Sequence, residues 1–200
     1  NGKGGHAASP HLAIDPVVIS AQVISAVQTI ISRSTDPVDK ALISITKINA
    51  GTAYNVIDDQ VKMGGTIRTF RKETRSYIEK RLREVCNGIA EAHGAEIKIQ
   101  FDLVNKYPPT INSKKESIFA ANVAKDLVGE DKVITDIDPS MGGEDFSYLL
   151  EEKPGTYLYL GQGDDNHKAH LHTTKYDFND NLLPVGVNFW VELVKKYFSK

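Results

Sequence analysis

The order of periodic segments in its first half most constrains how this 200-residue chain can fold. Alternation with a period of two is typical of strands, whereas apolar residues three or four positions apart are typical of helices. By these patterns a helix is predicted over residues 16–33, strands over 42–48 and 60–70, a second helix over 72–93, and a third strand over 95–104. This order predicts an antiparallel sheet with two helices on one face, the ferredoxin-like arrangement.

Local signals place the ends of these elements. Asp15 and Pro16 form a typical cap and first-turn pair, and Gly94 is expected to close the second helix in a left-handed conformation. The pair Gly64-Gly65 lies inside a predicted strand, where it indicates a bulge or a close approach of another backbone. The first helix is apolar around most of its circumference, so it needs cover on two sides. That cover is expected from a second chain or domain, or from deep burial within one chain.

The predicted sheet lacks one strand. A four-stranded version needs a strand immediately before Asn1, leading into the glycine-rich segment NGKGGHAASPH. We therefore expect the sequence to begin inside a domain.

The second half of the chain has a different pattern. Helices are predicted over 114–128, 144–152 and 181–198, and short strands over 133–137 and 157–161. Two short strands make a poor sheet for a free-standing domain, so this half is expected to be the end of a larger α/β domain. The predicted domains are residues 1–111 and 112–200.

Charge and composition exclude several classes of partner. The 24 Lys and Arg residues are balanced by 26 Asp and Glu residues, and the net charge of −2 offers no basic surface for nucleic acid. There is no uninterrupted run of 18 apolar residues and no signal-peptide pattern, so no membrane partner is expected. The single cysteine, Cys86, is consistent with a reducing, cytoplasmic compartment. A small molecule or another protein is the expected partner.

Three of the six histidines, His167, His170 and His172, lie within six residues. Neutral imidazole is a common zinc ligand, so the cluster is a candidate metal site. The alternative is an exposed polar loop, because no other motif nearby completes a set of ligands.

Other polar residues also have two interpretations. His6 follows two glycines and is either an oxyanion donor or an incidental turn residue. Arg68 could bind a substrate carboxylate or be a surface charge, and Asn55 could be a turn residue or a side-chain donor. Glu144 and Asp145 could be catalytic acids, but their position at a helix start favours a capping role.

Taken together, the segments resemble the zinc-dependent amidohydrolases that include hippurate hydrolase, N-acyl-amino-acid amidohydrolases and plant auxin-conjugate hydrolases. The resemblance covers nearly the whole chain. The motifs that carry it occur in the family's order and approximate spacing: GKGGHAASPH, IDPV, NAGTAYNVI, GGTIRTF, YPPTIN, MGGEDF and LHTTKYDFND.

The resemblance implies that residues 1–111 are most of a lid, or dimerisation, domain, and that residues 112–200 are the C-terminal part of a two-metal catalytic domain. His172 corresponds to the family's last metal ligand, whereas His167 and His170 match no ligand. The implied cofactors are two divalent metal ions, zinc first, with manganese, cobalt or nickel as alternatives. This chain would supply one ligand.

The resemblance also assigns roles within the lid. His6 corresponds to a catalytic histidine that reaches the active site of the partner subunit in a homodimer and stabilises the tetrahedral intermediate. Asn55 and Arg68 correspond to substrate-binding residues, Arg68 for the substrate carboxylate. Gly143 stands at a further substrate-binding position, where serine or alanine is common in the family.

The implied activity is hydrolysis of the amide bond of N-acyl amino acids. The family's other metal ligands and its general-base glutamate precede the segments matched here, so this chain alone is expected to lack a complete active site. One alternative is a non-catalytic module for dimerisation and ligand binding. Another is a related aminopeptidase or carboxypeptidase, or a deacetylase of N-acetylated diamino acids.

Overall fold

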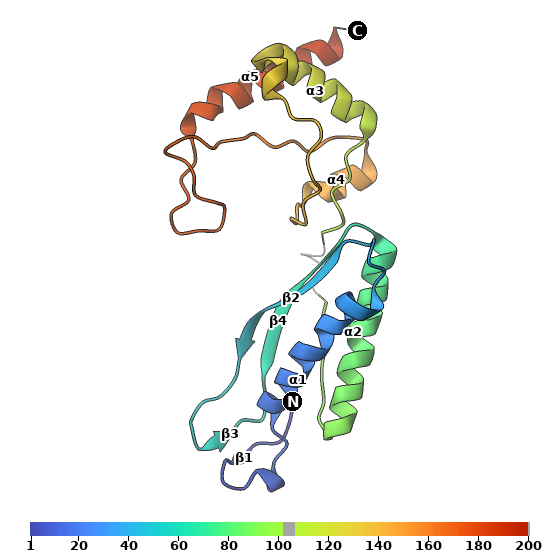
Figure 1. Ribbon diagram of the computed structural model, residues 1–200, viewed down its shortest axis with the longest axis vertical. Helices are drawn as coiled ribbons and strands as arrows, with labels where there is room; N and C mark the ends of the chain where they lie inside the picture. The colour runs from blue at the N-terminus through green and yellow to red at the C-terminus, as the bar shows by residue number, and fades with distance from the viewer. Residues whose placement is uncertain (102–106, 200) are drawn as a thin grey trace. The chain divides into compact units, whose positions relative to one another are not determined.

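The computed structural model describes residues 1–101 and 107–199, and the chain divides into two compact units (Figure 1). Unit 1 comprises Asn1–Pro109 together with Met141–Gly143, and unit 2 comprises Thr110–Ser140 and Glu144–Lys200. The functional assignment of residues 1–111 as a lid and 112–200 as part of a catalytic domain stays a prediction.

Unit 1 contains two long helices, two small sheets and short helical turns. In chain order its elements are β1 (Gly5–His6), η1 (Pro10–Leu12), α1 (Pro16–Thr29), η2 (Ile30–Ser34), β2 (Ala41–Asn49), β3 (Val56–Ile57), β4 (Lys62–Thr69) and α2 (Lys72–His93).

The helix ends follow the local signals. The Asp15 carboxylate accepts a hydrogen bond from the backbone N–H of Val17 at 2.8 Å and caps α1. A π-helical turn, η2, continues α1 to Ser34, near the predicted end. Gly94 ends α2 with φ of 64°, a left-handed conformation that glycine adopts without strain.

Strands β2 and β4 form an antiparallel pair that contains the predicted irregularity. The register shifts between Ile45 and Lys47, which lie opposite Gly65 and Gly64, so the extra residue belongs to β2 rather than to the glycine pair. A Cβ atom at Gly65 would lie 2.1 Å from the carbonyl oxygen of Ser44. Gly65 therefore permits a close approach of the β2 backbone, which was the second interpretation of the glycine pair.

One hydrophobic core joins both helices to this sheet. Its buried members come from α1, η2, β2 and α2: Ile19, Val23, Val27, Ile30, Ile43, Ile78 and Cys86. The mixed α/β class predicted from the sequence is confirmed. Val17 and Val18, on another side of α1, are 46% and 53% exposed, so the described residues bury only one side of the helix. Cover of the other side by a second chain or domain stays a prediction.

The helical segment Pro16–Ser34 has a mean hydropathy of 1.3 and is long and apolar enough to cross a membrane by length and composition. A core helix of a soluble protein meets the same criterion, and Ile19, Val23 and Val27 are at most 5% exposed within the core. One side of the helix therefore belongs to the core, while 28% of its 18-residue apolar window is buried in all.

The strand predicted over 95–104 does not form in the part that is described, and residues 102–104 lie outside the described residues. Ile97 and Ile99 pack against the core as their alternation predicts. Asn1 and Glu96 exchange two backbone hydrogen bonds, of 2.8 and 3.0 Å. A strand needs a partner along its whole length. Among the described residues, the segment 95–101 exchanges backbone hydrogen bonds with another extended segment only at Asn1. Of the three strands predicted in this half, 42–48 and 60–70 form and pair as β2 and β4, and the described residues contain a second small sheet of β1 and β3.

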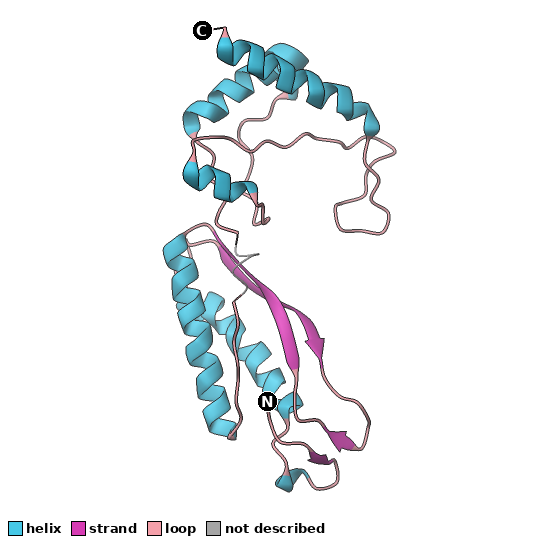
Figure 2. Cartoon of the chain, turned by 180° about the vertical axis from the view of Figure 1, so that it is seen from behind, coloured by secondary structure: helices cyan, strands magenta, loops and turns pink. Residues whose placement is uncertain are grey.

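Unit 2 consists of helices connected by long loops (Figure 2). Its elements are α3 (Lys114–Val128), η3 (Glu130–Lys132), α4 (Phe146–Glu152), η4 (Asp180–Leu182) and α5 (Leu183–Phe198). Helices α3 and α5 contact each other through the rings of Phe119 and Tyr197, whose centroids are 6.2 Å apart, and through an ion pair between Asp126 and Lys196. The three helices predicted for this half are confirmed.

The two strands predicted in unit 2 were wrong for this chain. The described structure has extended or irregular backbone at 133–137 and 157–161. Ile134 is 77% exposed and Tyr159 is 68% exposed. Apolar side chains stabilise a strand when a neighbouring strand and a facing layer cover them, and in this part of the chain neither covers these segments.

Candidate functional site

The fold brings His6 and Asn55 together in unit 1. Strand β1 pairs with β3, so that His6 lies opposite Val56, and the N–H of Ala7 donates to the carbonyl oxygen of Asn55 at 3.0 Å. Two residues 49 positions apart, both candidate site residues, thus occupy one exposed end of this small sheet.

A tight contact fixes the segment that precedes His6. The N–H of Gly4 donates to a carboxylate oxygen of Asp59 at 2.6 Å, and a Cβ atom at position 4 would lie only 2.8 Å from that oxygen. Glycine at this position therefore permits the approach, and the glycine-rich segment is held in place by Asp59.

The imidazole of His6 has a defined orientation. Its Nδ1 accepts a hydrogen bond from the N–H of Ala8 at 3.0 Å, within a turn closed by the N–H of Ser9 donating to the carbonyl oxygen of His6. An Nδ1 that accepts a hydrogen bond places the proton of the neutral ring on Nε2. The exposed Nε2–H is consequently available to donate to a ligand.

Arg68 and Gly143 also lie together, both within unit 1. Arg68 lies on β4, opposite Leu42 of β2. A Cβ atom at Gly143 would lie 2.4 Å from Nη1 of Arg68 and 2.8 Å from its Cζ. A side chain at position 143 would therefore displace the guanidinium.

His172 has an unusual backbone. Its φ of 63° makes it the single non-glycine residue with positive φ in the part of the chain that the structure describes. Non-glycine residues in this region are uncommon, and strained backbone concentrates at functional sites. The exposed imidazole of His172 is thus a candidate ligand, and its positive φ supports this independently of the sequence motif.

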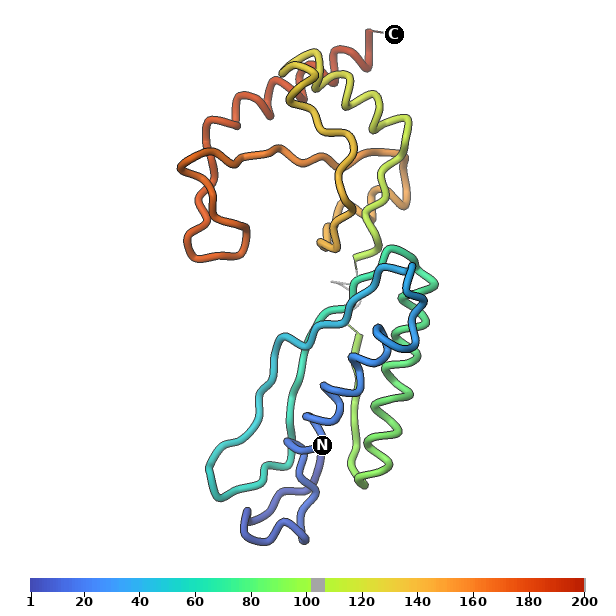
Figure 3. The backbone as a smooth tube through the Cα atoms, viewed as in Figure 1, coloured from blue at the N-terminus to red at the C-terminus, as the bar shows by residue number. Residues whose placement is uncertain are grey.

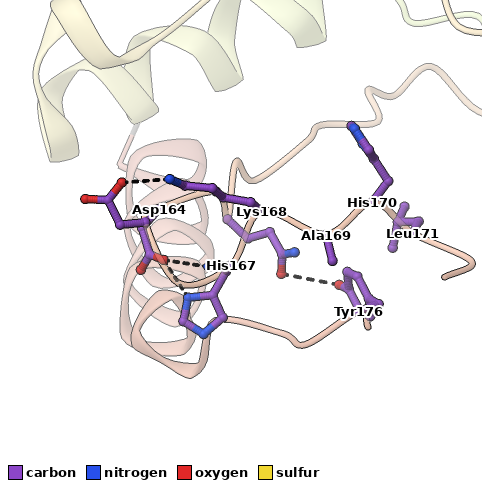
Figure 4. Close-up of a pocket in the computed structure, with 10 residues that line it drawn as sticks. Asp164, His167, Lys168, Ala169, His170, Leu171 and Tyr176 are labelled. Atoms are coloured by element: carbon purple, nitrogen blue, oxygen red, sulfur yellow. Dashed lines mark hydrogen bonds and ion pairs between the residues drawn. The ribbon is translucent and has the colours of Figure 1, made fainter. Parts of the chain in front are cut away.

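The three neighbouring histidines do not converge. His167 Nδ1 lies 2.7 Å from a carboxylate oxygen of Asp164, and Figure 4 shows the ring of His170 pointing away from that pair. The hydrogen bond with His167 lowers the pKa of Asp164 below its ordinary value. The described residues contain no group of three His, Cys, Asp or Glu side chains suited to a metal ion. Within the described residues, His172 could bind a divalent metal ion as one ligand, and the remaining ligands are not among these residues.

The three histidines lie in the loop formed by residues 162–179. A polar network joins the two ends of this loop, and it was not predicted from the sequence. Asn179 is 6% exposed, and its Nδ2 donates to the carbonyl oxygen of Gln162 at 3.2 Å and to a carboxylate oxygen of Asp164 at 3.0 Å. Asn179 precedes a helical turn, which is a signal for a cap. Its partners lie 15 and 17 residues earlier and leave no local signal.

Glu144 binds the first turn of α4, as its position favoured, whereas Asp145, the N-cap residue, makes no side-chain cap hydrogen bond. One carboxylate oxygen of Glu144 accepts from the N–H of Phe146 at 3.3 Å, and the other accepts from the hydroxyl of Tyr157 at 2.9 Å. The hydrogen bond from Tyr157 is the main cause that lowers the pKa of Glu144, and the same bond raises the pKa of Tyr157. Both acceptor oxygens are thereby occupied within unit 2.

Comparison with known proteins identifies a family. The model of peptidase family M20/M25/M40 matches residues 4–196. Hippurate hydrolase of Campylobacter jejuni is 37% identical over 99% of this chain and 50% of that protein. IAA-amino acid hydrolase ILR1-like 2 of Arabidopsis thaliana is 36% identical over 100% of this chain and 45% of that protein.

A solved structure has the same fold at a similar level of identity. The YXEP protein of Bacillus subtilis, described as a dinuclear metal binding peptidase from the M20 family, is 31% identical with a TM-score of 0.67. The match covers 90% of this chain and 45% of that one. The chain spans about half the length of the curated relatives it matches.

Proposed function

Because the chain belongs to peptidase family M20/M25/M40, we propose that it is part of a metal-dependent amidohydrolase that cleaves the amide bond of N-acyl amino acids. The observation that carries this proposal is the geometry of His6, an oriented Nε2–H donor beside Asn55. The relatives named for hydrolysis of hippurate and of IAA-amino acids, both amino-acid conjugates, support the substrate class.

His6 stabilises the developing oxyanion of the amide carbonyl. Its Nδ1 is occupied by the N–H of Ala8, so the ring donates from Nε2 without first having to reorient. A preorganised donor of this kind contributes about 2.7–4 kcal/mol to lowering the activation barrier. Asn55, whose carbonyl oxygen accepts from the N–H of Ala7, binds the same substrate through its side-chain amide.

Arg68 binds the carboxylate of the amino-acid half. A guanidinium can form two parallel hydrogen bonds with a carboxylate, which fixes the orientation of the substrate as well as its charge. Gly143 leaves the guanidinium in its present position, because a Cβ atom there would lie 2.4 Å from Nη1 and the flexible end of Arg68 would have to shift.

His172 supplies one metal ligand, and the other ligands and the general base come from outside the described residues. When bound, two divalent ions, zinc first and manganese, cobalt or nickel as alternatives, supply Lewis-acid activation of water and of the carbonyl. The left-handed backbone of the exposed His172 supports its assignment as a ligand.

The assembly we propose is a cytoplasmic homodimer formed through unit 1, in which His6 acts in the site of the partner subunit. The exposed side chains of Val17 and Val18 on α1 support such an interface. Cys86 is a free, buried thiol, which is consistent with a reducing compartment.

Replacement of His6 tests this function. In the complete hydrolase, His6→Ala should lower kcat on an N-acyl amino acid about 10²–10³-fold, because one oxyanion donor is lost. Metal content should stay unchanged. His11→Ala, a change at another exposed histidine of the same segment, is the matched control and should retain activity. Unchanged turnover in the His6 variant would contradict the role.

The lack of a three-ligand group among the described residues favours one alternative, a non-catalytic module for dimerisation and ligand binding. Metal content and turnover of the complete protein separate the two functions, because bound zinc together with hydrolysis of an N-acyl amino acid would exclude the non-catalytic module. Competition assays with N-acyl amino acids, short peptides and N-acetylated diamino acids would distinguish the amidohydrolase from a peptidase or a deacetylase.

A further inference from the structure

We propose that Asn179 is a positioning residue that closes the base of the loop 162–179 and so holds His172 in its left-handed conformation. The proposal rests on the proposed function only where it treats His172 as a metal ligand. The loop is an exposed segment of unit 2, and Figure 3 shows its two ends (orange) close together at its base.

The amide of Asn179 joins the two ends of the loop. Its Nδ2 donates to Asp164 at 3.0 Å and to the carbonyl oxygen of Gln162 at 3.2 Å, while its backbone N–H donates to Oε1 of Gln162 at 3.3 Å. Asn179 is 6% exposed although the residues around it in the sequence are exposed. A buried amide with these partners is costly to leave unpaired, so the closed base is favoured over an open one.

Asp164 extends the connection into the loop. The oxygen that does not bind Asn179 accepts from the N–H of Asn166 at 2.8 Å, the N–H of His167 at 2.9 Å and the ring of His167 at 2.7 Å. Tyr176, near the other end, donates its hydroxyl to Gln162 at 3.3 Å. These contacts therefore fix the backbone at both ends of the loop.

The other face of Asn179 anchors the loop to a helix. Its Oδ1 accepts from the N–H of Asn181 at 3.2 Å and caps the turn η4, which leads directly into α5. His172 lies between the two anchored ends, and its φ of 63° is unfavourable for a residue with a side chain. The hydroxyl of Thr173 donates to the carbonyl oxygen of His170 at 2.8 Å across His172, and the fixed ends of the loop limit the opening of this turn.

The isosteric variant Asn179→Asp tests the closure in this chain. It keeps the oxygen that caps η4 but removes the Nδ2 donor and places a second carboxylate beside Asp164. We expect amide hydrogen exchange of Asn166 and His167 to accelerate by about tenfold or more, because local opening becomes easier. The strong intraresidue HN–Hα NOE that a positive φ gives at His172 should weaken.

Asn112→Asp is the matched control. Asn112 Nδ2 also donates to a carbonyl oxygen, that of Tyr157 at 3.0 Å, and its Oδ1 accepts from the N–H of the same residue, which lies outside the loop. The change should leave loop exchange and the His172 NOE unchanged. If Asn179→Asp does not fold, Asp164→Ala removes the acceptor of the Asn179 amide from an exposed position. Because Asp164 also accepts directly from the N–H groups of Asn166 and His167, the readout in this variant is the His172 NOE, which should weaken. Unchanged exchange and NOE in the folded variants would overturn the closure.

Metal binding tests the positioning role. In the complete hydrolase, Asn179→Asp should weaken Zn²⁺ affinity, measured by chelator competition, about 10–100-fold, the effect typical of changes that disorder a ligand's surroundings. A loosened loop with unchanged affinity would overturn this role. Separately, a His172→Ala variant that retains its full metal content would contradict the proposed function, because His172 would then not be a ligand.

Discussion

At the scale of single residues, Gly143 determines the space available to Arg68. The Cβ atom of Gly143→Ala would lie 2.4 Å from Nη1 of Arg68, so the guanidinium must move. If Arg68 binds the substrate carboxylate, KM should rise about tenfold with a smaller change in kcat, since mainly uniform binding is lost. Steady-state kinetics of the complete hydrolase measure this split. Gly161→Ala, which meets open space, is the control, and an unchanged KM in the Gly143 variant would separate Arg68 from substrate binding.

The hydrogen bond between Tyr157 and Glu144 predicts a pH dependence. This bond lowers the pKa of Glu144, so it contributes stability above the carboxyl's ordinary pKa, and that contribution is lost as the pH falls through the lowered value. Tyr157→Phe should raise the pKa of Glu144 and reduce stability at neutral pH, with the difference from wild type shrinking in acid. Carboxyl NMR titration and urea unfolding at several pH values measure both effects.

The control for that experiment is Tyr159→Phe. Tyr159 packs edge-on against the ring of Tyr157, with centroids 5.5 Å apart, but is 68% exposed. Removing its hydroxyl should leave the pKa of Glu144 unchanged. A pKa of Glu144 that does not respond to Tyr157→Phe would show that the helix start alone sets it.

At the scale of elements, the sequence was sufficient for helices and insufficient for strands. The start of α1 follows from Asp15 and Pro16, and the end of α2 follows from Gly94, because caps act on neighbouring backbone. A strand requires a partner elsewhere in the chain. The alternation at β2 and β4 is realised because these strands pair, whereas 133–137 and 157–161 have comparable patterns without a described partner.

The candidate site divides in the same way. Motifs indicated His6, Asn55, Arg68, Gly143 and His172 as candidates one by one, and pairing of β1 with β3 then brought the first two together. The occupied Nδ1 of His6 and the closure of the loop by Asn179 depend on backbone geometry and on contacts across 17 residues. Sequence spacing does not encode such contacts, so they required the structure.

At the scale of the whole molecule, His6 could act either in its own subunit or in the site of its partner. The proposed reaction needs both His172 and His6, so mixing variants that each lack one of these histidines separates the two possibilities in the proposed homodimer. In a heterodimer of His6→Ala and His172→Ala subunits, one site regains both histidines if His6 acts across the interface. If His6 acts within its own subunit, each site lacks one histidine.

Equal mixing of the two inactive variants of the complete hydrolase should therefore restore about a quarter of wild-type activity, because half of randomly paired dimers are mixed and half of their sites are intact. Each variant refolded alone is the control. Val18→Glu, which places a charge on the exposed side of α1, should reduce both the dimer fraction in sedimentation and the restored activity. Mixed dimers that form, as shown by differently tagged subunits, but stay inactive would place His6 in the site of its own subunit.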